Sequence, residues 1–595
     1  MPVRRTVTID VETHSADQLY NMAPNEFVRL AGYAWDNSDH VHLSTDLDEL
    51  REAIRSARYI VGHNIHAFDL TAIFGADSIE PLELAREGRV IDSWTHSTLV
   101  HPAPRNYIDR RGRPRHVKGP EQAKLWHGLD EQAHQLGVQG KAYDLTELAR
   151  EFGGYDKIPL DEPRYEEYLR QDVRTGRLVL QALLRKGPLD KYAIREQLVA
   201  AIAAQISRNG WRVDVPAAQA RIKELDAIRD RYMAMLVEKH GMPSEGKAPL
   251  RTNAGKEAVL AALKSVGVRA DDLVRTKNGA PSLGGDSVKE AARGKGEEAE
   301  ALAEAIAAIG GIRPLAEGAL RHLHADGKVH PQITTLQRSG RWSTQDPGLT
   351  VWTSRGDGAE EKRYYIPNAD DEVLVELDLS QADARIVAAY SGDRKFAERF
   401  RPGADAHMIT AYAVWGKEEV DTNPAHYRQT AKACGHAYAY RAGARTIATT
   451  AGVAHSIAKK FVDGMQAAYR QVTRWQDKVT RLARKGYVVN AWGRKMLVDE
   501  GREWTQAPAL YGQSGTREIV CDGLIRLPNE ILRMVVAQVH DAIVLSVPAT
   551  RAEEIIAIVK RAMTCDWQPP DGTGQRVHFP VGVGPLGKNW ADAAH

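Results

Sequence analysis

Apolar, β-branched runs that are typical of buried strands occur near both ends of the chain and not in its middle. The runs are TVTIDVET at 6–13, RYIVGHN at 58–64, DEVLVELDLS at 371–380 and RMVVAQVHDAIVLSVP at 533–548. Residues 190–325 are instead Ala-rich and amphipathic, and a second mostly helical block runs from 404 to 485. This order predicts an α/β region, then a helical region, then a strand-based region that helices interrupt.

Length and composition predict a multidomain protein of a reducing cytoplasm. A chain of 595 residues is too long for one hydrophobic core, so we expect about three to five domains. The sequence contains no run of about 18 apolar residues, the length that a membrane-spanning helix needs. The three cysteines, Cys434, Cys521 and Cys565, have no metal-binding spacing, and the strand-like start leaves no room for a secretory leader. Membrane and secreted proteins are therefore disfavoured.

The distribution of charge is more informative than the net charge of +2. Residues 424–462 contain six basic and no acidic residues, and residues 105–124 contain seven basic and two acidic residues. Such stripes attract phosphate by Coulomb attraction and counterion release. Solvated helix faces and a flexible basic loop would look the same, so charge alone leaves both interpretations open.

Three acidic elements lie in the N-terminal region. Asp10 and Glu12 are two residues apart in a strand-like run and therefore project from the same face. Two neighbouring carboxylates repel each other unless a cation neutralises them, which suits Mg²⁺ or Mn²⁺. Asp69 follows the second apolar run, and Tyr168 and Asp172 share one helix face in YLRQD. Each element alone is more often structural, so only their combination indicates a site.

Two further aspartates lie at the ends of the C-terminal strand-like runs. The run DEVLVELDLS reaches Asp378 and passes into a predicted helix, and Asp541 lies between two apolar strands at a predicted hairpin tip. Aspartates from two distant segments, each at a strand end, could share a pair of metal ions. The alternative is that each is an ordinary turn residue.

A helix with basic and aromatic side chains is predicted to begin near Asn423. Asn423 is a favourable N-cap and Pro424 a favourable first helical residue. Four side chains then recur at every fourth position on one face: Arg428, Lys432, His436 and Tyr440. Two cations followed by two rings suit a nucleotide, with the charges at the phosphates and the rings at the base and sugar. An amphipathic helix with basic residues at its border would show the same pattern.

In order and spacing, the N-terminal acidic elements resemble the three motifs of DEDD-type exonucleases, and Tyr168 resembles the tyrosine of the DEDDy subclass. The resemblance implies an RNase H-like domain in which four carboxylates hold two metal ions: Asp10, Glu12, Asp69 and Asp172. It also implies that Tyr168 orients the attacking water. In-line attack on a phosphodiester suits one ion on the nucleophile and one on the leaving oxygen. We therefore expect an active 3′→5′ exonuclease.

The remainder of the chain resembles the DNA polymerases of family A, the bacterial DNA polymerase I type. The segments DLSQADAR at 378–385, the helix with Arg428 to Tyr440, and QVHD at 538–541 resemble motifs A, B and C of that family. Further matches are SGRWSTQDPGL, DAHMITA, GYVVNAWGRK, GQSGT and the closing GVGPLGKNWADAAH. The resemblance covers nearly the whole chain and implies a right-hand polymerase after the exonuclease domain.

The same resemblance assigns roles to individual residues of the polymerase. Asp378 and Asp541 would bind two Mg²⁺ ions, or Mn²⁺ in their place, with the Leu379 carbonyl as a further ligand. The nucleotide-binding residues that it implies are Arg428, Lys432, His436, Tyr440, Gln381, Asp383 and His407. The implied DNA-binding residues are Arg341, Gln513, Gln538 and His540, and the basic residues Lys247 and Arg251 of the predicted thumb are candidates for phosphate contacts.

Two positions depart from the family pattern where the sugar of the nucleotide is expected. Asp383 replaces the usual glutamate, which in the family blocks a ribose 2′-hydroxyl, and the shorter side chain leaves ribonucleotide rejection open. His436 replaces the usual phenylalanine or tyrosine near the sugar 3′ position and leaves the response to dideoxynucleotides open.

The predicted fold class is α/β multidomain, with five segments along the chain. They are an exonuclease domain at 1–188, a helical thumb at 189–328, a first palm segment at 329–400, fingers at 401–490 and a second palm segment at 491–595. Because Asp10 lies so near the N-terminus, no 5′ nuclease is expected. This layout resembles polymerases encoded by bacteriophages, which act in the cytoplasm of the infected bacterium.

The predicted function is DNA-templated extension of a primer by phosphoryl transfer, with proofreading. Primer–template DNA and dNTPs are the expected partners; which replisome partners (helicase, single-strand binding protein, processivity factor) it binds stays open. A single-subunit RNA polymerase would share the palm and fingers, but the editing motifs and the SQ-x-acid pattern disfavour it. A catalytically silent DNA-binding or exonuclease-only protein is disfavoured because both polymerase aspartates are present.

Overall fold

The computed structural model describes residues 6–141, 144–246, 248–276, 279–311, 315–351, 357–439 and 441–594. Within these residues the chain forms two compact units. The first comprises Met1–Arg212, His324–Ala359 and Ile366–His595, and the second comprises Val213–Leu323 and Glu360–Tyr365. The second unit begins 24 residues after the start of the predicted thumb, because helix α10 (Lys191–Asn209) belongs to the first unit. The five domain boundaries stay predictions.

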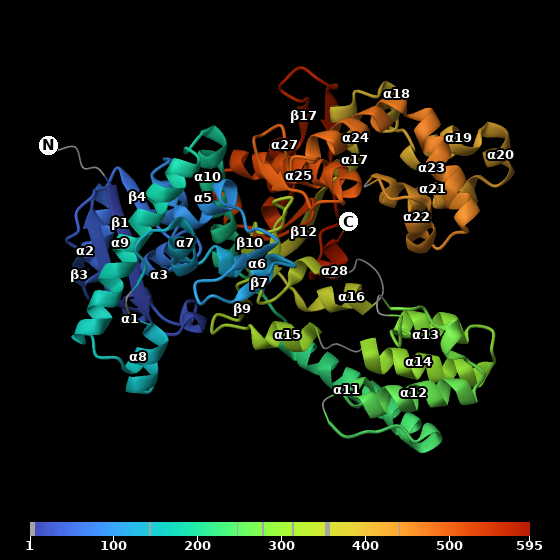
Figure 1. Cartoon of the computed structure of the whole chain (residues 1–595), viewed down its shortest axis with the longest axis horizontal. Helices are drawn as coiled ribbons and strands as arrows, with labels where there is room; N and C mark the ends of the chain where they lie inside the picture. The colour runs from blue at the N-terminus through green and yellow to red at the C-terminus, as the bar shows by residue number, and fades with distance from the viewer. Residues whose placement is uncertain are drawn as a thin grey trace. The chain divides into compact units, whose positions relative to one another are not determined.

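A five-stranded sheet forms the core of the N-terminal region (Figure 1). Its order is β3 (His42–Ser44), β2 (Val28–Trp35), β1 (Thr6–Thr13), β4 (Tyr59–Gly62) and β5 (Val90–Asp92). Strand β1 is antiparallel to β2 and parallel to β4, in agreement with the predicted RNase H-like domain. Val7, Ile9 and Val11 are buried in the core from one face of β1, so Asp10 and Glu12 project from the other.

Helix α9 (Pro163–Lys186) packs against β1 and β2. Pro163 is its first residue, and the Glu162 side chain caps it by accepting a hydrogen bond from Arg164 N. Gly32 of β2 is paired with Asp10, and a Cβ atom on Gly32 would lie 2.9 Å from Leu169 Cγ of α9. The glycine therefore lets the helix approach the sheet closely. This approach brings Asp172 of α9 onto the face of β1 that carries Asp10 and Glu12.

A four-stranded antiparallel sheet positions the second pair of acids. Its order is β15 (Val535–Val539), β16 (Ala542–Pro548), β12 (Glu372–Leu379) and β19 (Val581–Val583). Asp378 is paired with Ala542, the residue after Asp541, so the strand register itself places the two aspartates side by side. Helix α27 (Ala552–Met563) packs on this sheet, and α25 (Glu503–Arg526) packs on α27 and on α17 (Ala382–Ser391).

A block of helices follows α17 in the chain. Its members are α18 (Arg394–Glu398), α19 (Ala406–Trp415), α20 (Lys417–Thr422), α21 (Pro424–Ala439), α22 (Ala444–Ala451), α23 (His455–Ala468) and α24 (Arg470–Ala483). Trp415 and Tyr438 both pack against Phe461 inside the block. One face of α21 is buried at Ala431, Cys434 and Tyr438. Arg428 and Lys432 lie on its exposed face.

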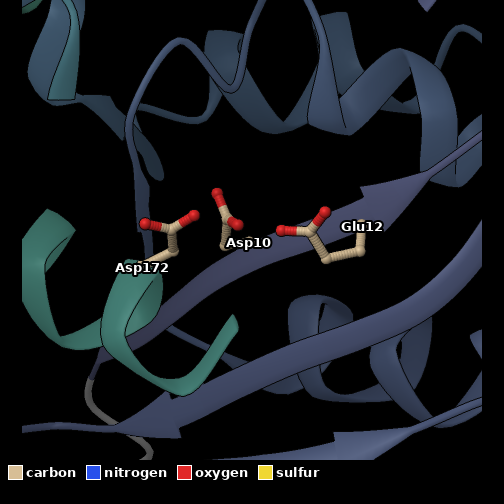
Figure 2. A group of neighbouring side chains, drawn as sticks. All are labelled: Asp10, Glu12 and Asp172. Carbon is tan, nitrogen blue, oxygen red and sulfur yellow. The ribbon is translucent and has the colours of Figure 1, made fainter. Parts of the chain in front are cut away.

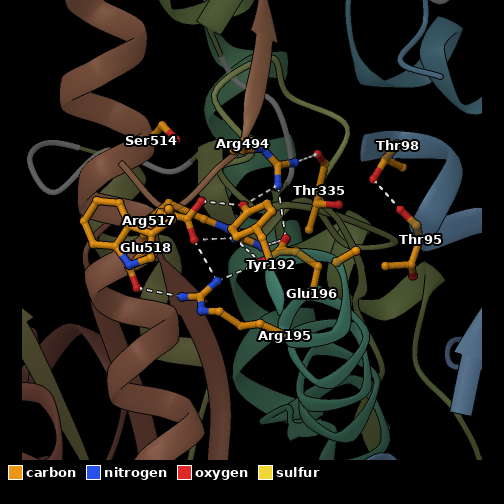
Figure 3. A network of polar contacts seen from close by, with 12 residues as sticks. Thr95, Thr98, Tyr192, Arg195, Glu196, Thr335, Arg494, Ser514, Arg517 and Glu518 are labelled. Atoms are coloured by element: carbon orange, nitrogen blue, oxygen red, sulfur yellow. Dashed lines mark hydrogen bonds and ion pairs between the residues drawn. The ribbon is translucent and has the colours of Figure 1, made fainter. Parts of the chain in front are cut away.

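A buried ion network joins α10 to α25 (Figure 3). Arg517 and Arg494 bind Glu196 at 2.7 and 3.1 Å, and Arg195 and Arg517 each bind Glu518 at 2.8 Å. All five side chains are at most 16% exposed. Removing one partner from a buried pair of this kind costs roughly 3–5 kcal/mol, because it leaves an uncompensated charge. The network therefore fixes α25, and with it the helices around the second sheet, against α10.

The second unit is helical, as the Ala-rich sequence predicts. Its helices include α11 (Val215–His240), α12 (Asn253–Ser265), α13 (Gly285–Ala292), α14 (Glu297–Gly311) and α15 (Leu315–Arg321). Leu236, Leu263, Val288 and Leu302 are buried together in its core. Across the described part of the chain, no helix combines the length and the apolar character needed to cross a bilayer.

Replacing Gly32 by alanine should destabilise the first unit, because the added Cβ would press on the fully buried Leu169. Overpacking of this kind costs about 1–3 kcal/mol, so the midpoint of urea unfolding should fall. Gly176→Ala within α9 is the matched control, since nothing lies within 4 Å of its added Cβ and alanine favours a helix. Unchanged midpoints for both variants would contradict the close approach of α9 to the sheet.

Candidate active sites

Three carboxylates meet between β1 and α9. Figure 2 shows Asp10 and Glu12 on the strand and Asp172 on the helix, with their carboxylate groups close together. One oxygen from each residue lies within 4.8 Å of the others. Oxygen donors gathered in this way suit a divalent cation such as Mg²⁺ or Mn²⁺. These are three of the four acids that the sequence predicts at one site.

Asp69, the fourth predicted acid, lies beside this group of three. It begins helix α3 (Asp69–Phe74) and is 3% exposed. Its Oδ1 accepts a hydrogen bond at 3.2 Å from the backbone N–H of Val11, which lies between Asp10 and Glu12 in the sequence. Its charge also raises the pKa of Asp10, so all four predicted acids act on one another.

Burial and mutual repulsion raise the pKa values of these carboxyl groups. Burial, followed by the charge of Asp172, raises the pKa of Asp10 well above its ordinary value and that of Glu12 to about 8. Burial also raises the pKa of Asp69 to about 7 and that of Asp172 to about 6. Ionising all four groups together is therefore unfavourable, and a divalent cation would relieve the repulsion.

Lys141 is a cation at this site that the sequence does not indicate. Its Nζ lies 2.6 Å from Asp172 Oδ1 and donates a hydrogen bond to the Tyr168 hydroxyl at 2.5 Å. Burial alone would lower the pKa of the ammonium group, but Asp172 and Tyr168 raise it. Burial has the opposite effect on Tyr168, whose pKa it raises, so the Tyr168 hydroxyl stays protonated. Lys141 lies in a loop without periodicity or motif, so no sequence signal marks it.

Asp378 and Asp541 form a second acidic pair. At the end of β12, Leu379 N donates a hydrogen bond to the Asp541 carbonyl at 3.2 Å. Burial and then the Asp541 charge raise the pKa of Asp378 to about 8, while burial and then Asp383 raise that of Asp541 to about 6. The two predicted aspartates therefore lie where one cation could neutralise both.

Asp383 is held by two residues from other segments. Arg341 Nη2 donates to both of its carboxylate oxygens, at 2.7 and 3.0 Å, and Thr516 Oγ1 donates to Oδ1 at 2.5 Å. The Arg341 charge lowers the pKa of Asp541, so this ion pair lies beside the second acidic pair. The sequence predicts separate contacts for Arg341 and Asp383 and includes Thr516 in the GQSGT match, but it gives no sign that these three side chains meet.

Four residues that the sequence predicts at the synthetic site, three glutamines and one histidine, lie on α17, on the β15–β16 hairpin and on α25. Gln381 caps α17 with φ +52°, and His540 forms the β15–β16 turn with φ +57°, both in the left-handed region that non-glycine residues seldom adopt. Gln538 is buried in β15 and donates to the His540 carbonyl at 2.5 Å, while Gln513 is half-buried on α25. Left-handed backbone next to Asp541, and three residues after Asp378, is typical of functional turns.

The exposed face of α21 carries the predicted phosphate contacts. Arg428 Nε donates to Asp405 Oδ2 at 2.5 Å, and Asp405 also caps α19 by accepting from His407 N at 3.0 Å. Burial, followed by the charges of Arg399 and Arg428, lowers the pKa of His407. Lys432 is exposed one turn beyond Arg428. Asp405 begins the DAHMITA match, but the sequence assigns it no role; in the structure it orders Arg428 before any ligand binds.

Three predicted contacts are not placed by the structure. His436 belongs to α21, but its side chain is not described, and Tyr440 and Lys247 lie outside the described residues. Arg251 is exposed at the end of a short helical turn, Pro249–Arg251, in the second unit. The roles of these four residues stay predictions.

Comparisons with known proteins bear on both regions. The family model described as DNA polymerase family A matches residues 277–592, more than half of the chain. The DNA polymerase of Mycobacterium phage D29 is 27% identical over 427 residues, which cover 70% of this chain and 67% of that protein. The DNA polymerase of Mycobacterium phage L5 is 25% identical over 538 residues, which cover 87% of this chain and 82% of that protein.

A solved structure also shares the fold. It is the POL domain of Pol1 from M. smegmatis in complex with DNA primer-template and dNTP. The match has a TM-score of 0.74 at 17% sequence identity and covers 99% of this chain and 96% of that chain. The α/β multidomain fold class predicted from the sequence is thereby confirmed.

Without divalent ions, stability should fall as the pH rises. The acidic groups have folded pKa values above their unfolded values of about 4, so the folded state binds more protons and loses stability between about pH 4 and pH 8. In EDTA the unfolding temperature should therefore fall over this range, and Mn²⁺ should restore it. Glu12→Gln should flatten the dependence, whereas the exposed Glu52→Gln should leave it unchanged. Equal pH profiles for wild type and Glu12→Gln would contradict the electrostatic account.

Proposed function

This chain belongs to DNA polymerase family A, and we propose that it extends a primer 3′ end at one acidic site and proofreads that end at another. Asp378 and Asp541 would form the synthetic site, and the carboxylates around Asp10 would form the 3′→5′ exonuclease site. One observation carries the proposal: two separate groups of carboxylates with raised pKa values, one between β1 and α9 and the other where β12 meets the β15–β16 turn, in a chain of this family. The relatives from mycobacteriophages support a role in the replication of phage or bacterial DNA.

The donor set of the synthetic site fits Mg²⁺. Two half-buried carboxylates with raised pKa values, together with the adjacent Leu379 carbonyl, offer the hard oxygen ligands that Mg²⁺ prefers. Two bound Mg²⁺ ions would stabilise the charge that develops on the attacking and leaving oxygens. Gln538 of β15 and His540 of the β15–β16 turn, which precedes Asp541, would hold the primer 3′ end against this pair.

The exposed basic face of α21 would bind the phosphates of the incoming dNTP. Arg428 and Lys432 are exposed one turn apart, and charge-assisted hydrogen bonds to phosphate are among the stronger polar contacts. Asp405 holds the Arg428 guanidinium in place, so binding would lose less side-chain entropy there. His407 and Gln381 would contact the same nucleotide. His436 would lie near its sugar and Tyr440 beneath its base, as the sequence predicts.

Asp383 would test the nucleotide sugar from a fixed position. Its carboxylate is held on both oxygens by Arg341 and on one by Thr516. A side chain held in this way cannot swing aside for a ribose 2′-hydroxyl without breaking charged hydrogen bonds, which offsets its shorter reach. Arg341 and Gln513 would contact the minor groove, where acceptors vary little between base pairs, so they test pair shape and not sequence.

The N-terminal site would hydrolyse the phosphodiester of a frayed 3′ end. Oxygens of Asp10, Glu12 and Asp172 lie within 4.8 Å of one another, and Asp69 lies beside them, so the set fits a pair of Mg²⁺ or Mn²⁺ ions. The Tyr168 hydroxyl stays protonated and would orient the attacking water through a hydrogen bond. Binding alone discriminates poorly between similar base pairs, and editing of this kind supplies further accuracy.

Primer–template DNA and dNTPs are the proposed ligands. The M. smegmatis Pol1 domain, which shares the fold, was solved with a primer-template and a dNTP, and this supports the proposal. Arg251 and Lys247 of the second unit would contact phosphates of the duplex. Helicase, single-strand binding protein or a processivity factor would be further partners in a replisome.

The two activities should separate by mutation. Asp378→Ala should abolish primer extension while degradation of a labelled 3′ end continues, because it removes a carboxylate from the synthetic site alone. Asp10→Ala should abolish degradation while extension continues. One labelled primer–template, incubated with Mg²⁺ in the presence and absence of dNTPs, measures both. Loss of both activities in either folded variant would contradict the two-site proposal.

A further inference from the structure

The basic run at residues 105–118 forms a hairpin that neither active site uses. Strands β6 (Asn106–Ile108) and β7 (Pro114–His116) pair in antiparallel register, and residues 109–113 form the turn. Asp109 is 4% exposed and organises the turn, since its Oδ1 accepts from the backbone N–H groups of Arg111 and Arg113. Its Oδ2 accepts from Arg115 Nε at 2.7 Å. One buried acid thus fixes a turn from which arginines project.

Arginines and apolar side chains are exposed together on this hairpin. The side chains of Arg110, Arg111 and Arg113 are 43%, 56% and 54% exposed. Ile108 is 57% exposed, and Leu125 on α6 (Pro120–Trp126) is 55% exposed. Arg110 and Arg111 lie 3.5 Å from Asp130 and Asp144, pairings that stabilise little in water and exchange readily for other anions.

A cavity beside the hairpin extends to Lys141, the cation that binds the exonuclease carboxylate Asp172. Its volume is about 300 Å³, and Tyr107, Arg110, Arg111 and Leu125 are among its lining residues. Lys141 lines the same cavity, and its ammonium lies 2.6 Å from Asp172. A phosphate chain that approached the four exonuclease acids would be repelled, and cations along this cavity would counter that repulsion.

A second cavity, of about 550 Å³, borders the opposite end of the hairpin. The hairpin segment contributes Arg105, His116 and Lys118, and the polymerase segments contribute Arg338 and Lys495. Arg338 of its lining lies three positions before Arg341 in the sequence, and the Arg341 guanidinium holds Asp383 beside Asp541. The hairpin therefore borders one cavity that reaches Lys141 of the exonuclease site and another that polymerase segments line.

From this arrangement we propose that the β6–β7 hairpin binds single-stranded DNA and guides a frayed primer 3′ end from the synthetic site to the exonuclease carboxylates. Arg110 and Arg111 contact phosphates, and Tyr107 and Ile108 contact bases. The half-buried Tyr107 ring and the exposed apolar and arginine side chains would bind bases that duplex pairing would otherwise cover, which selects a single strand over a duplex. The direction of travel rests on the proposed proofreading function, but the binding surface itself does not.

The double variant Arg110→Gln/Arg111→Gln tests the proposal and keeps the Asp109 contacts that close the turn. Arg150→Gln/Arg185→Gln is the matched control, because it removes two exposed arginines of the same N-terminal region away from both cavities. Binding of a labelled oligo-dT is measured by fluorescence anisotropy, over a range of salt concentrations, with each pair in the degradation-deficient Asp10→Ala protein.

The hairpin variant should bind oligo-dT roughly tenfold more weakly than the control at low salt, with a salt slope smaller by about 1.4, because two phosphate contacts are lost. Binding of a fully paired blunt duplex should not change. Oligo-dT affinity and salt slope equal to those of the control would overturn the proposal. Equal weakening for duplex and single strand would also overturn it, because the surface would then not select single strands.

Measuring nucleotide release separates two outcomes: the absence of exonuclease activity, and a hairpin that does not guide the strand. With Asp10 intact, release of nucleotides from a mismatched primer terminus should be several-fold slower in the hairpin variant than in the control variant. If the wild type releases no nucleotides in Mg²⁺, the proposed exonuclease function fails, while the oligo-dT measurements still decide the binding surface. If release occurs at equal rates in the two variants, the hairpin does not guide the strand.

Discussion

Repulsion between carboxylates that the backbone forces together is the constraint on which the rest of the structure depends. In each sheet an apolar strand holds an acid beside an acid from another segment. Asp172 lies beside Asp10 and Glu12, and Asp541 lies beside Asp378. Burial of the apolar faces of these strands offsets the cost of holding like charges close. Burial, and then repulsion from the neighbouring acids, raises the carboxyl pKa values, and the binding of divalent ions would relieve the repulsion.

A fixed basic side chain moderates the repulsion at each site without cancelling it. At the exonuclease site Lys141 is paired with Asp172, and at the synthetic site Arg341 is paired with Asp383 beside Asp541. Lys141 also lies 3.8 Å from Asp130, and the other acids of each site are left to a metal ion. The buried network of arginines and glutamates between α10 and α25 then holds the helices around the second sheet, so that its acidic pair keeps its geometry when charged ligands enter and leave.

The sequence predicts what local patterns determine. The alternation of TVTIDVET puts Asp10 and Glu12 on one strand face, and the strand-end positions of Asp378 and Asp541 follow from flanking apolar runs, as the structure shows. Lys141 was not predictable, because no periodicity or motif marks it. Asp405 and Thr516 lie in the DAHMITA and GQSGT matches, but their hydrogen bonds to Arg428 and Asp383 depend on how segments distant in sequence pack. The ion pair of Arg341 with Asp383 likewise depends on how two segments pack. The parts of His436 and Tyr440 in nucleotide binding stay predictions.

The most direct test of the central claim is to locate bound divalent ions by anomalous X-ray scattering in crystals grown with Mn²⁺ and DNA. We expect manganese peaks in two separate places, one bound by Asp378 and Asp541 and the other bound by Asp10, Glu12 and Asp172. Asp378→Ala should remove only the first group of peaks. Manganese absent from either carboxylate group, at a concentration that supports DNA synthesis, would contradict the account.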